Sequence, residues 1–315
     1  MEKRRLGRSA LAVAPIAFGG NVFGWTVDEA VSFRLLDRFV ERGFNLIDTA
    51  NIYGGRGEGE GASEAIFGKW LAASGKRDAV VVATKVGMEM APGRKGLSAA
   101  AIKQEVEASL RRLQIDTIDL YQSHEDDLAT PQEETLRAYA ELVQEGKVRV
   151  IGASNFSASR LAEALSISVG NGWPRYETLQ PEYHLARRAE FEKELQPLCV
   201  EEEIGVITYF SLASGFLTGK YRSEADLKGN ARGEIVGKYL DTRGLRLLSV
   251  MDEVAARHEA TLAQVALAWL LTRDAVVAPI VSATSLAQLD ATLDAVDLRL
   301  DDEALARLEE ASDGE

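Results

Sequence analysis

Short apolar segments alternate with longer amphipathic ones along almost the whole chain, and this alternation limits the folds that it can adopt. The apolar segments have the length of buried strands, and the segments between them carry apolar residues at helical spacing. Val31, Leu35 and Phe39, for example, fall on one face of a helix that Asp28 can cap. Strands that alternate with helices predict a parallel sheet covered by helices.

The whole chain can be divided on this basis. Strands are expected at 15–18, 44–47, 80–83, 118–122, 148–152, 178–179, 205–209 and 276–281. Helices are expected at 28–41, 62–73, 98–113, 131–145, 157–165, 187–203, 245–258, 261–272, 285–296 and 301–311. A small β-hairpin within residues 3–14 precedes them, and a long segment rich in glycine and charge, 214–244, follows the seventh strand.

Strand–helix units of this number fit an α/β protein of the (β/α)8 TIM barrel type, and 315 residues is a little above the usual size of that fold. No Ser/Pro-rich linker and no shift in composition divides the chain, so residues 1–315 are expected to form a single domain. The alternative is a doubly wound open sheet, which would bind a dinucleotide on a G-x-G-x-x-G turn after the first strand. Gly19, Gly20 and Gly24 do not have that spacing.

The charge of the chain narrows the possible partners. Its 36 basic and 49 acidic residues give a net charge of −13, with no basic run, which argues against nucleic acid or an anionic membrane as partner. Cys199 is the only cysteine and cannot form an internal disulfide. No signal peptide is evident, and no apolar stretch approaches the roughly 18 residues of a membrane span. We therefore expect a cytoplasmic protein that acts on a small molecule.

In a barrel of this type the active site lies at the carboxyl ends of the strands, so the residues there are the first candidates. Asp48 ends the second strand and Tyr53 follows on its loop, while Lys85 and His124 end the third and fourth strands. The later strands also end on polar side chains: Ser154, Asn155, Gln180, Tyr209, Ser211, Ser282, Thr284 and Ser285. Loops are polar in any protein, but a lysine and a histidine directly after buried strands favour a functional interpretation.

The four ionisable groups form a chemically sensible set. A phenol is a weak acid, and a nearby ammonium lowers its pKa by favouring the phenolate. A buried carboxylate beside the lysine keeps the ammonium charged, and a neutral histidine can orient a carbonyl oxygen. The set contains no evident nucleophile, and three histidines in all suggest no metal site. The chemistry therefore calls for a cofactor that delivers hydride.

These residues resemble the catalytic motifs of the aldo-keto reductases. The matching stretches are Asp48-Thr49-Ala50-x-x-Tyr53-Gly54, Thr84-Lys85, Asp119-Leu120-Tyr121-Gln122-x-His124, and the segments 146–156, 180–183 and 212–221. The resemblance covers essentially the whole chain and is nearest to the microbial branch related to potassium-channel β subunits. It implies a barrel that binds NADP(H), with NAD(H) possible, and that reduces a small carbonyl compound.

The resemblance also implies roles for particular residues. Tyr53 would be the general acid, Lys85 and Asp48 would tune it, and His124 would orient the carbonyl. Ser154, Asn155 and Gln180 would hold the nicotinamide carboxamide, with Tyr209 stacked on the ring. The other cofactor contacts would be Gly20, Ser211, Leu212, Gly215, Lys220, Arg232, Ser282, Thr284, Ser285 and Gln288. The substrate pocket would include Asn21, Phe23, Trp25 and Asp126.

One region departs from the family pattern. Relatives commonly offer a basic residue after strand eight for the adenosine 2′-phosphate, but no lysine or arginine lies between Arg273 and Arg299. The phosphate would instead rely on hydroxyl groups at a helix N-terminus, or on a base from the long segment. The candidates on that segment are Lys220, Arg222, Lys228 and Arg232. We expect NADPH to bind more tightly than NADH by a modest margin.

Two other functions remain open from the sequence. The chain could be a regulatory subunit that binds nicotinamide and senses redox state, as the likeness to channel β subunits suggests, although the intact set of Asp48, Tyr53, Lys85 and His124 favours turnover. It could also be a barrel isomerase or lyase that uses Lys85 as a Schiff base. Either a monomer or a small homo-oligomer is compatible with the charge and patterning.

Overall fold

A parallel eight-stranded sheet forms the centre of the computed structural model, which describes residues 1–54, 61–91, 93–229 and 233–313. The strands are β3 (Ala17–Gly19), β4 (Leu46–Asp48), β5 (Val81–Val86), β6 (Ile118–Ser123), β7 (Val148–Ser154), β8 (Tyr176–Gln180), β9 (Gly205–Val206) and β10 (Ile280–Val281). Their order in the sheet is β10-β3-β4-β5-β6-β7-β8-β9. The two edges approach each other, because Val277 N donates to Val206 O and Ile280 N to Thr208 O, each at 2.8 Å. The predicted (β/α)8 barrel is confirmed.

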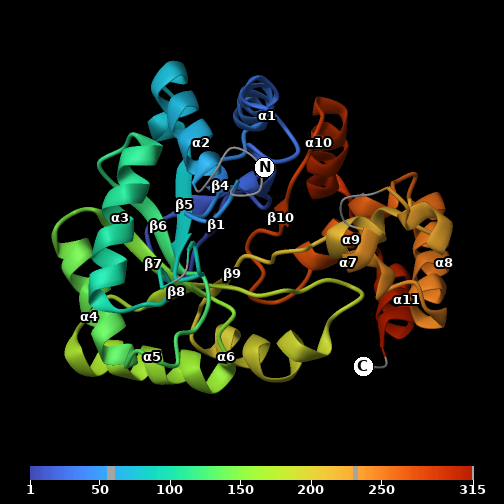
Figure 1. Ribbon diagram of the computed structural model, residues 1–315. Coiled ribbons are helices and arrows are strands. Elements are labelled where there is room, and N and C mark those ends of the chain that lie inside the picture. The colour runs from blue at the N-terminus through green and yellow to red at the C-terminus, as the bar shows by residue number, and fades with distance from the viewer. Residues whose placement is uncertain (55–60, 92, 230–232, 314–315) are drawn as a thin grey trace.

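Helices surround the strands on all sides (Figure 1). They are α1 (Glu29–Glu41), α2 (Ala62–Ser74), α3 (Ala99–Leu113), α4 (Gln132–Gln144), α5 (Ala158–Asn171), α6 (Gln196–Glu201), α7 (Gly233–Gly237), α8 (Thr242–Arg257), α9 (Leu262–Leu271), α10 (Leu286–Leu293) and α11 (Asp302–Ser312). Several begin where a polar side chain accepts a hydrogen bond from the first turn, as Asp28, Ser98 and Ser285 do for α1, α3 and α10.

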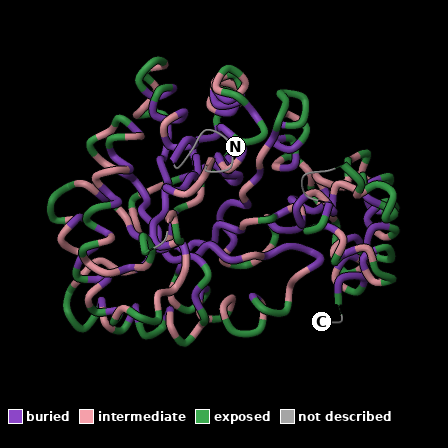
Figure 2. The backbone as a smooth tube through the Cα atoms, in the orientation of Figure 1, coloured by how far each residue is buried: buried purple, intermediate pink, exposed green. Residues whose placement is uncertain are grey.

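Side chains along each strand alternate between the inside of the barrel and the layer under the helices. On β5, Ala83 and Lys85 point inward, whereas Thr84 points outward and donates to the buried Glu64 of α2 at 2.5 Å. The outward layer forms the larger apolar core, and Figure 2 shows burial along the strands and exposure on the outer loops. This alternation places every second strand residue in the barrel interior, where only the last of them can reach the carboxyl-end rim.

An antiparallel hairpin, β1 (Arg4–Arg5) and β2 (Ala12–Val13), precedes the barrel as predicted. Leu6 and Val13 are fully buried in a second apolar cluster with the inward residues of the strands, including Leu46 and Leu120. Arg4 donates to Val276 O at 3.0 Å. The hairpin therefore packs into the amino-terminal end of the barrel and closes it.

Two elements differ from their predicted bounds for physical reasons. The regular seventh strand, Gly205–Val206, is shorter than the predicted 205–209, although the chain stays paired with the neighbouring segment as far as Tyr209, whose N donates to Pro181 O. The left-handed φ of Phe210, 51°, then ends the extended backbone. The helix expected at 187–203 is a π-helical turn, Phe191–Leu195, followed by α6. Pro197 lacks the N–H that would continue the α-helical hydrogen-bond pattern across this junction.

The segment after β9 is not plain loop. It contains two 3-10 helices, η4 (Ala213–Thr218) and η5 (Glu224–Leu227), and the short α7. Among the described residues, no helix combines the length and apolar character that crossing a bilayer requires.

Candidate active site

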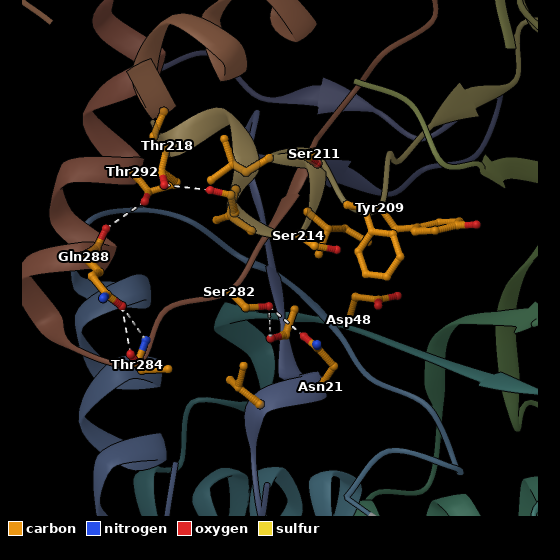
Figure 3. A pocket seen from close by; sticks show the side chains of 18 of the residues that line it. Asn21, Asp48, Tyr209, Ser211, Ser214, Thr218, Ser282, Thr284, Gln288 and Thr292 are labelled. Atoms are coloured by element: carbon orange, nitrogen blue, oxygen red, sulfur yellow. Dashed lines mark hydrogen bonds between the residues drawn. The ribbon is translucent and has the colours of Figure 1, made fainter. Parts of the chain in front are cut away.

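A cavity of about 930 Å³ opens at the carboxyl ends of the strands. Figure 3 shows its lining from Asp48 and Tyr209 at one end, through Asn21 and Ser282, to Thr284, Gln288 and Thr292 at the other. Residues from both ends of the chain therefore meet in one elongated space. The end near Asp48 holds the predicted catalytic residues.

Lys85 is fully buried beneath this end and connects Asp48 with Tyr53. Its ammonium donates to Asp48 Oδ2 at 2.5 Å, to Thr49 O at 2.8 Å and to Tyr53 Oη at 3.4 Å. The strand register explains the pairing, since β4 and β5 are hydrogen-bonded neighbours and both residues point inward. The arrangement connects a phenol facing the cavity to a buried charge pair.

The electrostatics of this trio depend on burial and on the pair itself. Burial opposes the charged form of Lys85, but Asp48 and Tyr53 outweigh it and leave the pKa of Lys85 above its ordinary value. Burial also opposes the charged form of Tyr53 and so raises the pKa of its phenol, while the charge of Lys85 lowers that pKa in part. Tyr53 is thus protonated at neutral pH and can donate. A charged Lys85 held by Asp48 also argues against a Schiff base, which requires a neutral amine.

His124 completes the set as an uncharged ring. Burial, with a smaller contribution from the charge of Lys85, holds the pKa of His124 well below its usual range. Its ring meets that of Tyr53 edge-on, with centroids 5.7 Å apart. Its Nδ1 is buried and has no hydrogen-bond partner among the described residues. A neutral imidazole beside the phenol can orient a carbonyl oxygen without competing for its proton.

Asp48 is held by two glutamine side chains, of which one was not anticipated from the sequence. Gln180 Nε2 donates to Asp48 Oδ1 at 2.9 Å, as does Gln122 Nε2 at 3.2 Å. Gln122 points inward on β6, two residues before His124. The period of two along that strand was the available signal. With Lys85 on Oδ2, both oxygens of the buried carboxylate are satisfied.

A second hydrogen-bonded group lies beside this set, at the ends of β7, β8 and β9. Tyr209 Oη donates to Asn155 Oδ1 at 2.8 Å, and Asn155 Nδ2 donates to His124 O at 2.9 Å. Ser154 Oγ donates to Gln180 O at 2.8 Å. The network fixes Asn155, whose backbone has a left-handed φ of 57°. Ser154, Asn155, Gln180 and Tyr209 all line the cavity.

The far end of the cavity is lined by neutral polar groups. Thr284 donates to Gln288 Oε1 through its N (3.0 Å) and its Oγ1 (2.9 Å). Ser282 Oγ lies 2.8 Å from Gly19 O and 2.7 Å from Asn21 Oδ1. A Cβ at Gly19 would meet that Ser282 Oγ at 2.7 Å, so the close approach of β3 and β10 needs glycine there. Hydroxyl and amide groups of this kind can bind the sugars and phosphates of a dinucleotide.

The comparisons with known proteins agree with this geometry. A family model described as the aldo/keto reductase family matches residues 15–313. The chain belongs to this family. Aldo/keto reductases are oxidoreductases that act on small carbonyl compounds and generally use NADPH or NADH.

Several aldo/keto reductases and related proteins align with nearly the full chain. The uncharacterized oxidoreductase YrpG of Bacillus subtilis is 36% identical, covering 100% of this chain and 97% of its own length. Aldo-keto reductase AFTS1 of Alternaria alternata is 35% identical, with 98% and 91% covered. A probable voltage-gated potassium channel subunit beta of Arabidopsis thaliana is 33% identical, with 95% and 92% covered. The branch suggested by the sequence motifs is therefore represented among the relatives.

Most of the residues of this chain that were expected to contact the cofactor line the cavity, but some lie elsewhere. Ser211, Leu212, Gly215 and Lys220 line it, whereas Gly20 does not, although its neighbour Gly19 does. Ser285 is the N-cap of α10 and is not a lining residue. Arg222 forms an ion pair with Asp252, with 2.7 Å between Arg222 Nη2 and Asp252 Oδ1. Neither Arg222 nor Lys228 lines the cavity. Arg232 lies outside the described residues.

Of the residues expected to form the substrate wall, only Asn21 lines the cavity among those that the structure describes. Asn21 lines the cavity, but Phe23 is fully buried and stacks on Phe18 with ring centroids 5.4 Å apart. Trp25 is 36% exposed and is not a lining residue. Asp126 forms an ion pair with Arg160, with 2.7 Å between Asp126 Oδ2 and Arg160 Nε, and does not line the cavity either.

Other lining residues were not anticipated. They include Met88, Phe210, Thr218, Thr261, Ala263 and Thr292. Phe210 and Thr218 belong to the segment after β9, and Thr261 and Thr292 come from the α9 and α10 region. Their approach to the site depends on how distant segments fold together, which no local pattern in the sequence indicates.

Proposed function

We propose that the protein reduces aldehydes or ketones to alcohols with NADPH, and that NADH can replace NADPH with a modest loss of affinity. The observation that carries this proposal is the buried Lys85 ammonium, which connects Asp48 to the phenol of Tyr53 beside a neutral His124. Residues 1–315 would act as one catalytic domain, as a monomer or a small homo-oligomer in the cytoplasm.

The cavity has features that suit a nicotinamide dinucleotide. It is elongated, and hydroxyl and amide groups occur along its length among apolar side chains such as Val22 and Leu212. Ser154, Asn155 and Gln180 would hold the carboxamide, and Tyr209 would flank the ring. Ser282, Thr284 and Gln288 would face the adenosine portion, and Lys220 is a cation that lines the cavity. When bound, the reduced cofactor supplies hydride to the carbonyl carbon.

The residues of the chain would handle the proton and the developing oxyanion. Tyr53 donates its phenolic proton to the carbonyl oxygen as charge develops there. The ammonium of Lys85 stabilises the resulting phenolate, and Asp48 keeps Lys85 charged. His124 orients the carbonyl oxygen toward Tyr53 without acting as an acid itself, because its ring is neutral. Gln122 and Gln180 hold Asp48 in position.

The test is steady consumption of NADPH with a panel of aldehydes and ketones, followed by detection of the alcohol. Turnover that depends on the aldehyde and produces a stoichiometric amount of alcohol is the expected result. The same panel with NADH tests the breadth of cofactor use. Binding of NADPH without any turnover would overturn the proposal.

A second candidate is a regulatory subunit that binds nicotinamide and senses redox state. The relative named as a potassium channel subunit beta favours this alternative. Tight dinucleotide binding together with undetectable reduction of every carbonyl compound would support it. The catalytic set of Asp48, Tyr53, Lys85 and His124 makes turnover the better-supported function.

A further inference from the structure

A buried carboxylate, Glu105, lies on the inner face of α3, the helix that packs against β5. It is 7% exposed and shares that face with the buried Ile102 and Ser109, three residues before it and four after it. An apolar side chain is expected at such a position. A buried carboxylate needs hydrogen-bond partners or a counterion, and an apolar residue of similar volume is often at least as stabilising. Packing of α3 alone therefore does not require a carboxylate here.

Two side chains from different loops bind this carboxylate. Asn51 Nδ2 donates to Glu105 Oε2 at 3.2 Å, and Arg94 Nη2 donates to Glu105 Oε1 at 2.8 Å. Asn51 is buried, whereas the side chain of Arg94 is 42% exposed. The charge of Glu105 is thus compensated from the solvent side by Arg94, and its hydrogen bond to Asn51 reaches from α3 toward the active site.

Asn51 belongs to the loop that carries Tyr53. Its backbone N donates to Lys85 O at 3.3 Å, which holds the loop against β5. Tyr53 N donates to Ala50 O at 3.1 Å and closes a turn that contains Asn51. Asn51 therefore attaches this loop to the barrel wall twice, with its backbone on β5 and its side chain on α3.

The contact that follows this attachment is sensitive to position. Tyr53 Oη lies 3.4 Å from Lys85 Nζ, at the long end of the range for a hydrogen bond. A small outward movement of the loop would break this contact. Misplacement of a reacting group by about 1 Å can lower a rate by about 10²-fold. A buried hydrogen bond between α3 and the loop opposes such a movement.

We propose that Glu105 is a positioning residue for proton transfer, which acts through Asn51 to keep the phenol of Tyr53 within reach of Lys85. The inference rests on the proposed carbonyl reduction, in which Tyr53 is the acid. Glu105 does not line the cavity. Its loss should therefore slow the chemical step and leave dinucleotide binding intact.

The first experiment compares Glu105→Met, which accepts no hydrogen bond, with Glu105→Gln, whose carbonyl oxygen can still accept one from Asn51. The rate of NADPH oxidation in a single turnover should fall at least about tenfold in Glu105→Met and stay within about threefold in Glu105→Gln. The Kd for NADPH should change little in both. Glu107→Ala is the matched control, because Glu107 lies on the same helix and pairs with Lys147 at a more exposed place. An unchanged rate in Glu105→Met would overturn the inference.

The second experiment uses Asn51→Ala, which removes the same hydrogen bond and leaves the pair of Glu105 with Arg94 in place. It replaces Glu105→Met if that variant does not fold. We expect the same loss of rate, and a double variant that is little slower than either single variant. Equal and additive losses would overturn the inference, because the two residues would then act independently.

A third comparison separates positioning from general stability. In a Tyr53→Phe background, Glu105→Met should have almost no further effect, because the phenol that it positions is absent. A full loss of rate in that background would show that Glu105 only stabilises the fold. A loss of NADPH affinity as large as the loss of rate would show that the loop binds the cofactor. Either result would overturn the inference.

These outcomes are separable from failure of the proposed function. If the unmodified protein reduces no carbonyl compound with either dinucleotide, carbonyl reduction itself is wrong and the positioning role falls with it. If the unmodified protein and Glu105→Met reduce carbonyl compounds at the same rate, only the positioning role is wrong.

Discussion

The ammonium of Lys85 lies 2.5 Å from Asp48 Oδ2, and both side chains are almost completely buried. A buried ion pair of this kind is stabilising only while both partners are present, because either charge alone would be desolvated and unpaired. Here the pair also carries a third hydrogen bond, from Lys85 to Tyr53 at 3.4 Å. The charge pair and the proposed acid therefore form one unit, and the mutations that test it should behave as one.

Tyr53→Phe removes the phenolic proton and little else. We expect kcat to fall by at least about 10²-fold, which is the lower range for loss of general acid catalysis. Dinucleotide affinity should stay within a few-fold, because the proposed nicotinamide contacts Asn155, Gln180 and Tyr209 lie at or after the ends of other strands. Steady-state rates and a fluorescence titration measure the two quantities. Near-normal reduction of a good aldehyde would remove Tyr53 from the role of acid, and lost cofactor binding would make it structural.

Lys85→Met should also reduce turnover strongly, since the phenolate of Tyr53 loses its stabilising charge. The double variant with Tyr53→Phe should be little worse than Tyr53→Phe alone, because groups that act as a unit are non-additive. Rates of both single variants and the double variant complete the cycle. Additive losses would indicate that Lys85 acts independently of Tyr53. Circular dichroism is the control, because Asp48 loses its partner in Lys85→Met.

Acidification should lower stability through two buried histidines. Burial depresses the pKa of His124, and also that of His184, whose neighbour Glu182 opposes the shift only in part. The unfolded chain therefore binds more protons below about pH 6.5, so the free energy of unfolding falls as the pH drops. Each proton contributes a slope of about 1.4 kcal/mol per pH unit. Urea unfolding at pH 7.5, 6.5 and 5.5 measures it, and His184→Gln should flatten the curve. Equal stability at the three values would contradict this.

Glu64→Ala should destabilise the barrel. Glu64 is fully buried and accepts hydrogen bonds from Thr84 (2.5 Å) and from Arg112 Nε (2.6 Å). Removing one partner of a buried pair costs about 3 kcal/mol or more. Glu29→Ala is the matched control, because its pair with Lys69 is largely exposed and should contribute less than about 1 kcal/mol. Similar losses in the two variants, measured by urea unfolding, would contradict the prediction.

Dinucleotide preference should be modest and should depend on Lys220. We expect NADPH to bind more tightly than NADH, and Lys220→Ala to weaken NADPH more than NADH if its charge serves the 2′-phosphate. Equal losses for both would place Lys220 on the shared pyrophosphate. A titration in which NADH binds tenfold tighter, about 1.4 kcal/mol, would contradict the NADPH preference. Arg232→Ala is the companion variant.

That the four candidate catalytic side chains lie together could be predicted because it depends on local order along the chain. Asp48, Lys85 and His124 each follow a short apolar run, and in a barrel the ends of such runs meet at one rim. The period of two along a strand then decides which side chains face inward. The same reasoning, applied to β6, would also have found Gln122.

The remainder of the site depends on contacts between distant segments. Phe210 enters the cavity because the chain turns left-handed after β9, and no pattern in the sequence predicts that a phenylalanine will adopt such a φ. Phe23, by contrast, was expected in the cavity wall and lies in the core. Its place after the first strand suggested a pocket wall, but the sequence does not reveal that Phe18 is positioned to stack on it.

The hairpin that closes the amino-terminal end has a kinetic consequence. With Leu6 and Val13 filling that end, a dinucleotide and a carbonyl compound bound as proposed would share the cavity at the opposite rim. Whichever reactant lies deeper has to enter first, and the product of the outer reactant has to leave before the other is released. Such a geometry implies an ordered sequential scheme, in which initial-rate lines intersect and product inhibition identifies the order of arrival.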